Sequence, residues 1–188
     1  MKKNITQQQI LDAAFKLTIE NGLDKLALKD VAEAIGIRSP SLYNHFNGLR
    51  ALRHAMSSAL YVEFNARMTS VLADKTGVDA IRIWAITYRQ FSLEKRAAYD
   101  LLWDFADITD PQLRAPMHDH NNLLKALLAP FAKNEADLLT LHRGWRSFLH
   151  GYLALSLHGF FKDDDSRDAS FEALLEQHLA QLTAQKEA

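Results

Sequence analysis

The sequence predicts an all-α protein of about nine helices. Apolar residues recur three and four positions apart along most of the chain, which is the spacing of one helix face. The 7 glycines and 4 prolines are few, and most fall where this spacing is interrupted. No stretch alternates apolar and polar residues as a half-buried strand would. We expect a small N-terminal domain of three short helices, 1–54, followed by a larger helical domain, 55–188.

Composition narrows the class of protein. With 188 residues, 48% of them apolar and 24% charged, the chain can bury a sizeable core. No apolar run is long enough to span a membrane, and the basic start lacks the apolar stretch of a signal peptide. The absence of cysteine excludes disulfides and thiolate metal sites. We therefore expect a cytoplasmic protein without a membrane partner.

Charge is distributed unevenly along the chain. The net charge is -1, but residues 1–54 carry eight Lys and Arg against five Asp and Glu, which gives +3. The remaining residues carry fourteen against eighteen, which gives -4. A basic N-terminal segment suits an anionic partner, although a difference of this size also arises by chance.

The first helix is expected to begin after Thr6. Its hydroxyl can accept a hydrogen bond from an otherwise unpaired backbone N–H, and Gln9 completes a capping box. Gly22 is expected to end the helix as a left-handed C-cap. Between these ends, apolar residues keep helical spacing at Ile10, Ala13, Ala14, Leu17 and Ile19.

The next two helices are joined by a short turn that contains glycine. The second helix is predicted over 28–35, and Gly36 stops it because glycine readily adopts positive φ. Ser39 is expected to cap a third helix with Pro40 at its first position, where the missing N–H costs nothing. This third helix is predicted to run through Phe46.

Together these two helices form a helix-turn-helix pattern, whose second helix can lie in the major groove of DNA. Short polar side chains near the start of that helix suit contacts with base edges, and its backbone N–H groups attract phosphate. The residues of this kind are Arg38, Ser39, Ser41 and Asn44. An ordinary helical hairpin is the alternative, because glycine turns between helices are common.

Three consecutive stretches carry a family resemblance: ILDAAFKLTIENG at 10–22, LALKDVAEAIGI at 26–37 and SPSLYNHFNGLRAL at 39–52. They resemble the DNA-binding domain of TetR-type (tetracycline-repressor-like) regulators. The resemblance implies that Tyr43 and His45 touch phosphate, and that residues around Ser-Pro-Ser reach bases or phosphate. Lys29 matches a capping position near the DNA backbone. The expected DNA-binding residues are Lys29, Arg38, Ser39, Pro40, Ser41, Tyr43, Asn44, His45 and Arg50.

One position departs from the family pattern. After the phenylalanine the family usually has two residues and then a lysine that anchors phosphate, whereas this chain has Asn47, Gly48 and then Leu49. Arg50 follows one place later, but a shift of one residue rotates a helical side chain by about 100°. Binding is therefore expected to depend on other basic residues as well, namely Lys2, Lys3, Arg38, Arg50 and Arg53.

The larger domain is predicted to be entirely helical. A long helix from Leu49 to about Lys75 has buried positions near a four-residue interval, at Leu52, Met56, Leu60, Phe64 and Met68. Further helices are predicted at about 78–92, 94–104, 111–132, 134–161 and 168–185.

Residues 143–161 are apolar on almost every face, which predicts a helix buried on several sides. Gly144, Gly151 and Gly159 suggest a close helix approach, because glycine inside a helix costs roughly 0.5–1 kcal/mol relative to alanine. The Trp-x-x-x-Leu-His-Gly arrangement at 145–151 resembles the C-terminal domain of one TetR branch. That resemblance implies a homodimer through the last two helices. The alternative is the core helix of a monomer.

Aromatic residues are frequent in the first half of the larger domain. In the resembled family this region encloses an effector pocket, and aromatic walls suit an apolar or planar ligand. The expected ligand-binding residues are Trp84, Tyr88, Phe91, Trp103, Met117 and His150, with Tyr99 and Phe105 nearby. Plain core packing is the alternative. Arg89, Arg96 and Arg146 could neutralise an anionic ligand, although we expect each of them at the solvated surface.

Eight histidines raise the question of a metal or an enzyme. His118 and His120 are two apart and do not share a helix face, and no His-Glu-x-x-His pattern occurs. There is also no glycine-rich phosphate loop and no nucleophile motif. We therefore expect no metal, no cofactor and no enzymatic activity.

These observations predict a DNA-binding transcription regulator, in most members of the resembled family a repressor. It would bind a pseudo-palindromic operator as a homodimer and be released by a small-molecule effector. One alternative is a DNA-binding protein of the same fold that has no ligand. Others are a helical sensor whose N-terminal unit contacts protein, and an enzyme that uses the histidines.

Overall fold

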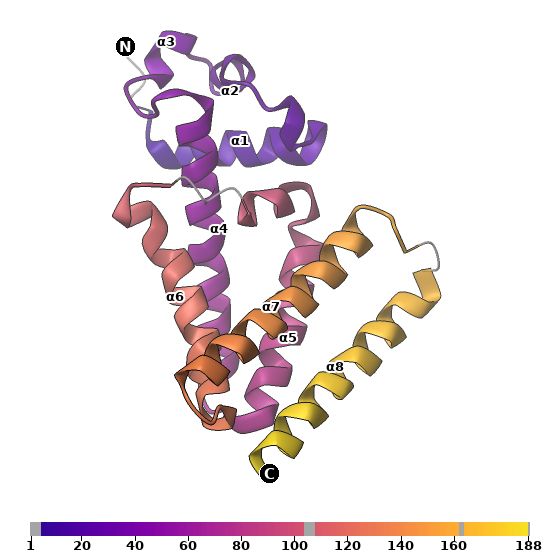
Figure 1. Ribbon diagram of the computed structural model, residues 1–188. Helices are drawn as coiled ribbons and strands as arrows, with labels where there is room; N and C mark the ends of the chain where they lie inside the picture. Colours follow the sequence, from indigo (N-terminus) through magenta and orange to yellow (C-terminus); the bar gives the residue numbers. More distant parts are fainter. Residues whose placement is uncertain (1–4, 104–107, 162–163, 188) are drawn as a thin grey trace. The chain divides into compact units, whose positions relative to one another are not determined.

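The computed structural model describes residues 5–103, 108–161 and 164–187 (Figure 1). All regular structure among these residues is helical, which confirms the all-α prediction. The chain divides into two compact units, which we call unit 1 (residues 1–63 and 95–117) and unit 2 (residues 64–94 and 118–188). Within the described ranges, no helix is long and apolar enough to cross a bilayer.

The helices are distributed over the two units as follows. Unit 1 contains α1 (Gln7–Asn21), the 3₁₀ helix η1 (Leu23–Lys25), α2 (Leu28–Ala34), α3 (Ser39–Leu42), the first part of α4 (Gly48–Leu72), the 3₁₀ helix η2 (Arg96–Leu102) and the start of α6 (Pro111–Leu128). Unit 2 contains the remainder of α4 and α6, with α5 (Gly77–Glu94), the 3₁₀ helix η3 (Ala129–Phe131), α7 (Glu135–Leu157) and α8 (Asp164–Glu187). The functional boundary predicted after residue 54 falls inside α4 and stays a prediction.

Several predicted elements differ in kind or in length from those observed, and two of them involve 3₁₀ helices. The segment 94–104 was predicted as an α-helix, but it forms the 3₁₀ helix η2, which packs on α1 and η1 within unit 1. The α-helix predicted at 111–132 ends at Leu128, and the 3₁₀ helix η3 follows it. Pro130 in η3 lacks the N–H that would continue the α-helical hydrogen bonds.

The start of α1 confirms the predicted capping box. Thr6 Oγ1 accepts from the Gln9 N–H at 3.2 Å, and the Gln9 side chain accepts from the Thr6 N–H at 3.0 Å. Gly22 caps the other end with φ of 88°, but its ψ of 151° is extended and not left-handed helical as predicted. Ile19 does not belong to the buried face: it is 71% exposed, because nine residues after Ile10 it points to the opposite side of the helix.

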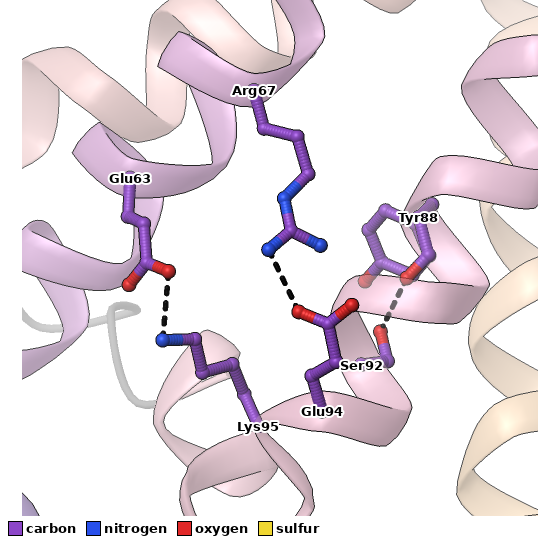
Figure 2. A network of polar contacts seen from close by, with 6 residues as sticks. All are labelled: Glu63, Arg67, Tyr88, Ser92, Glu94 and Lys95. Atoms are coloured by element: carbon purple, nitrogen blue, oxygen red, sulfur yellow. Dashed lines mark hydrogen bonds and ion pairs between the residues drawn. The ribbon is translucent and has the colours of Figure 1, made fainter.

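Helix α4 has the predicted four-residue interval of core residues. Leu52, Met56, Leu60, Phe64 and Met68 are all 1% exposed or less. Its polar side makes two ion pairs, one in each unit, which Figure 2 shows: Glu63 with Lys95 at 2.7 Å and Arg67 with Glu94 at 2.7 Å. Because all four side chains are partly exposed, each pair contributes at most about 1 kcal/mol.

In unit 2, α5 packs against both α7 and α8 (Figure 1). Arg89 of α5 contacts Phe171 of α8: its guanidinium lies 5.0 Å from the centroid of the Phe171 ring. The same guanidinium donates a hydrogen bond to Asp168. Arg89 is therefore engaged within the protein and does not occupy the solvated position that we predicted for it.

Helix α7 differs from its prediction in two respects. It is not buried on almost every side, because Gly144, Ser147 and Gly151 are exposed along one face. Gly159 lies beyond the helix end, with φ of 77°, and forms the closing turn instead of a helix contact. A Cβ at Gly144 or Gly151 would meet no atom of the described residues within 4 Å, so no contact inside the chain requires these two glycines.

Candidate functional site

The turn between α2 and α3 is a Schellman motif centred on Gly36. The Ile37 N–H donates to the Ala32 carbonyl at 3.0 Å, and the Gly36 N–H donates to the Glu33 carbonyl at 3.0 Å. Gly36 has φ of 72°, which glycine adopts without steric cost. The predicted role of this glycine is confirmed, and the turn sets the direction in which α3 leaves α2.

Helix α3 is shorter than predicted and begins differently. It ends at Leu42 instead of Phe46, because the following N–H of His45 bonds to the carbonyl three residues back and tightens the chain. Ser39 is the first helical residue and not the cap. The N-cap is Arg38, which makes no side-chain capping bond.

The packing of α3 separates anchoring side chains from displayed ones. Leu42 is fully buried and Phe46 is 7% exposed, so these two hold the segment on unit 1. Tyr43 lies between them in sequence and is 59% exposed, an unusual position for a large aromatic side chain. The segment therefore presents a phenol and several polar groups outward. The exposed residues are Arg38, Pro40, Ser41, Tyr43 and Asn44, whereas Ser39 and His45 are half-buried.

Three basic positions flank this surface. Lys29 at the start of α2 and Arg50 in the first turn of α4 are both exposed, as contacts with a DNA backbone require. Leu49, where the family usually has lysine, is half-buried. Arg53 is also half-buried and its Nε is buried, so it is less available to phosphate than Arg50. The predicted contributions of Lys2 and Lys3 lie outside the described residues.

Four of the six predicted ligand-binding residues lie together in unit 2. Tyr88 stacks with Trp84 at a centroid distance of 5.6 Å and donates or accepts a 2.9 Å hydrogen bond with His150 Nδ1. Phe64, which we did not assign to the site, contacts both Tyr88 at 5.4 Å and Phe91 at 4.9 Å. The structure thus joins residues of α4, α5 and α7 into one aromatic cluster.

The other two predicted ligand residues belong to unit 1. Trp103 packs edge to face with Tyr99 at 6.1 Å and is 37% exposed. Met117 is 6% exposed. Phe105 lies outside the described residues. The roles predicted for Trp103 and Met117 in ligand binding stay predictions.

Sequence reasoning missed His120 as a member of the aromatic cluster. It is 3% exposed, and its ring lies 4.9 Å from Phe64 and 5.8 Å from both Trp84 and Tyr88. Burial lowers its pKa to about 3, helped by the positive charge of Arg146. His120 is therefore held neutral.

His142 and His150 experience the same two influences. Burial, followed by the charge of Arg146, lowers the pKa of His142 to about 4 and that of His150 to about 2. Arg146 is half-buried with its Nε buried, so the surface position that we predicted for it is wrong. The missed signal was spacing: His142, Arg146 and His150 are four residues apart and share a face of α7. Among the described side chains, no group of three or more acidic, histidine or cysteine residues is arranged to hold a metal ion.

The geometry of α2, Gly36 and α3, with its displayed polar side chains, defines a helix-turn-helix transcription regulator. The family model "Bacterial regulatory proteins, tetR family" matches residues 10–56, and "Tetracyclin repressor-like, C-terminal domain" matches residues 81–178. Because the second model covers more than half of the chain, the protein belongs to the TetR family of DNA-binding transcription regulators.

One sequence relative and two solved structures show what the chain is similar to. The helix-turn-helix transcriptional regulator YobS of Bacillus subtilis is 26% identical over 163 residues, 86% of this chain and 84% of YobS. A protein of unknown function from Rhodococcus has a similar structure, with a TM-score of 0.79, 18% identity and 96% coverage of both chains. A TetR variant from Acinetobacter baumannii in complex with minocycline has a TM-score of 0.74 at 20% identity, with 98% of this chain and 100% of that chain covered.

Proposed function

We propose that the protein is a homodimeric repressor that binds a pseudo-palindromic operator and releases it when a small molecule binds unit 2. The observation that carries the proposal is the exposed set of side chains on and around α3, anchored by buried Leu42 and Phe46. Such an arrangement leaves Tyr43, Ser41 and Asn44 available to base edges and phosphates without disturbing the core. His45, Lys29 and Arg50 are the proposed backbone contacts.

The exposed face of α7 supports a homodimer. It presents Gly144, Ser147 and Gly151, together with Leu155, which is 43% exposed. Small residues let a second helix approach closely, and two-fold dimers are the commonest soluble oligomers. A dimer would place two copies of α3 about 34 Å apart, one helical turn of DNA, on a two-fold operator.

A substitution on this face tests the dimer. Gly151→Glu places a charge in the proposed interface and should give a monomer in light scattering coupled to size exclusion. Gln90→Glu, at an exposed position on α5, is the control and should remain dimeric. A monomeric wild-type protein would overturn this part of the proposal.

Ligand release is proposed as a shift between two populations. An effector that binds better to the form in which the two α3 helices are misspaced for DNA lowers operator affinity. A coupling of about 1–3 kcal/mol corresponds to a change of roughly 5- to 150-fold. The aromatic cluster around Tyr88 and the minocycline bound by the Acinetobacter protein support an effector in this part of the chain.

DNA binding is tested by fluorescence anisotropy with duplexes from the promoter regions that flank the protein's own gene. We expect one duplex to bind much more tightly than random sequence, and both affinities to fall steeply with salt as counterions are released. Absence of any salt-dependent affinity would contradict the proposal. A metabolite that raises Tm and frees the DNA would exclude the alternative of a ligand-free DNA-binding protein.

A further inference from the structure

Two buried N–H groups in unit 2 have no hydrogen-bond acceptor among the described residues. They are Nε1 of Trp84, a side chain that is 1% exposed, and Nε of Arg146. Indole and guanidinium nitrogens can only donate, so each of these groups needs a hydrogen-bond acceptor. Nε2 of His142, a residue that is 5% exposed, is likewise buried without a partner in the described part of the chain. Because neutral His142 already bonds to the backbone of Asn121, this nitrogen is an acceptor and not a donor. We call Trp84 and Arg146 the donor cluster.

Both residues of the donor cluster act on the same histidine, His120. Trp84 stacks on His120 at 5.8 Å with 20° between the ring planes. The positive charge of Arg146 helps to lower the pKa of His120. The donor cluster therefore combines hydrogen-bond donors of α5 and α7 that both act on one histidine of α6. Arg146 and His150 are only half-buried, so both residues are partly exposed at the surface of unit 2.

The charge of the donor cluster is positive and uncompensated by the described residues. None of their carboxylates forms an ion pair with Arg146, in contrast to Arg89, which bonds to Asp168, and Arg67, which bonds to Glu94. The neighbouring histidines contribute no charge, because burial keeps His120, His142 and His150 neutral near pH 7. A partly buried guanidinium in the same cluster as an unpaired indole N–H favours an anionic acceptor group.

We propose that the donor cluster binds the carboxylate of a small monocarboxylic acid, whose apolar part packs against the aromatic side chains of α5. The acid would be the effector of the regulator, and this role in DNA release rests on the proposed function. Binding itself does not. The carboxylate supplies two acceptor oxygens, which match the Arg146 and Trp84 donors.

The test uses benzoate as probe and benzamide, its neutral isostere, as control, with hexanoate as an aliphatic monocarboxylate. The chain has three tryptophans, so a ¹H–¹⁵N spectrum of the full-length protein contains three indole N–H signals. We expect the carboxylates to raise Tm and to shift the Trp84 signal, identified by its loss in Trp84→Phe. Benzamide should do neither.

Variants on α7 test the guanidinium. Arg146→Gln should weaken benzoate binding by about 10- to 100-fold, the range of a hydrogen bond to a charged group. Arg143→Gln, at an exposed position on the same helix, should bind as the wild type does. Arg146→Lys keeps the charge without Nε and should retain part of the affinity. Circular dichroism checks that each variant is folded.

The outcomes separate this inference from the proposed function. Equal binding of benzoate and benzamide, unchanged affinity in Arg146→Gln, or no binding of either carboxylate at millimolar concentration would overturn the inference. Release of DNA by a neutral compound alone would contradict the effector role of the carboxylic acid and leave the proposed function intact. Benzoate binding that never releases DNA would keep the carboxylate site and contradict its effector role.

Discussion

The surface on and around α3 and the donor cluster of unit 2 differ in how exposed their functional side chains are. On and around α3, buried Leu42 and Phe46 anchor a short segment whose functional side chains point to solvent, with Tyr43 59% exposed. In the donor cluster of unit 2 the functional side chains are more buried, because Trp84 is 1% exposed and Arg146 is half-buried. A large rigid partner such as DNA can be bound by exposed side chains. A small ligand needs side chains on several sides of it. Substitutions of the exposed side chains should therefore change DNA binding and leave stability unchanged. Substitutions at the donor cluster should affect both ligand binding and stability.

The largest expected effect comes from removing an anchor of the surface. Leu42→Ala deletes a fully buried side chain, which typically costs about 2–5 kcal/mol of unfolding free energy. Urea denaturation should show this loss, and DNA affinity should fall with it because α3 loses its support. Ser41→Ala, next to it but exposed, is the control and should change stability by no more than about 0.5 kcal/mol. Equal stabilities would mean that Leu42 does not anchor α3.

The turn should show the next largest effect. Gly36→Ala forces a side chain to φ of 72°, which costs about 1–3 kcal/mol. A Cβ there meets no described atom within 4 Å, so the cost is conformational and not a clash. Gly36→Asn should recover part of it, because asparagine tolerates positive φ. If both variants were equally destabilised in urea, crowding and not backbone conformation would be the cause.

Acid should destabilise unit 2 through its buried histidines. The unfolded chain binds protons near the ordinary pKa of 6.5, whereas folded His120 binds them only near its pKa of about 3. Stability is therefore complete above pH 6.5 and falls as pH decreases toward 3, by up to about 1.4 kcal/mol per pH unit for each such histidine. His120→Phe should flatten this dependence, and His118→Phe, which is exposed, should not. An unchanged slope in His120→Phe would show that His120 is not held neutral.

The sequence was sufficient for features with a local physical cause. The Thr6 capping box, the Gly36 turn and the four-residue interval from Leu52 to Met68 depend on neighbours in the chain, and all are present as predicted. Of the candidate ligand site, Trp84, Tyr88, Phe91 and His150 were predicted and lie together.

The remaining features depend on packing between segments distant in sequence. His120 was missed because only the fold brings α6 against Trp84 and Phe64. Arg146 was predicted at the surface because an arginine is usually solvated, and only the contacts of α7 show its Nε to be buried. The early end of α3 was also missed: Phe46 is buried as a core residue, but it lies beyond the last helical residue, Leu42.

Tyr43→Ala tests the central claim that the α3 surface is built to bind DNA. Because Tyr43 is exposed, the substitution should change the unfolding free energy of the protein by no more than about 0.5 kcal/mol. Operator affinity measured by anisotropy should fall about tenfold or more, through loss of a hydrogen bond to charged phosphate. Ile19→Ala, at another exposed apolar position in unit 1, should leave affinity unchanged. Wild-type operator affinity in a folded Tyr43→Ala variant would contradict the account.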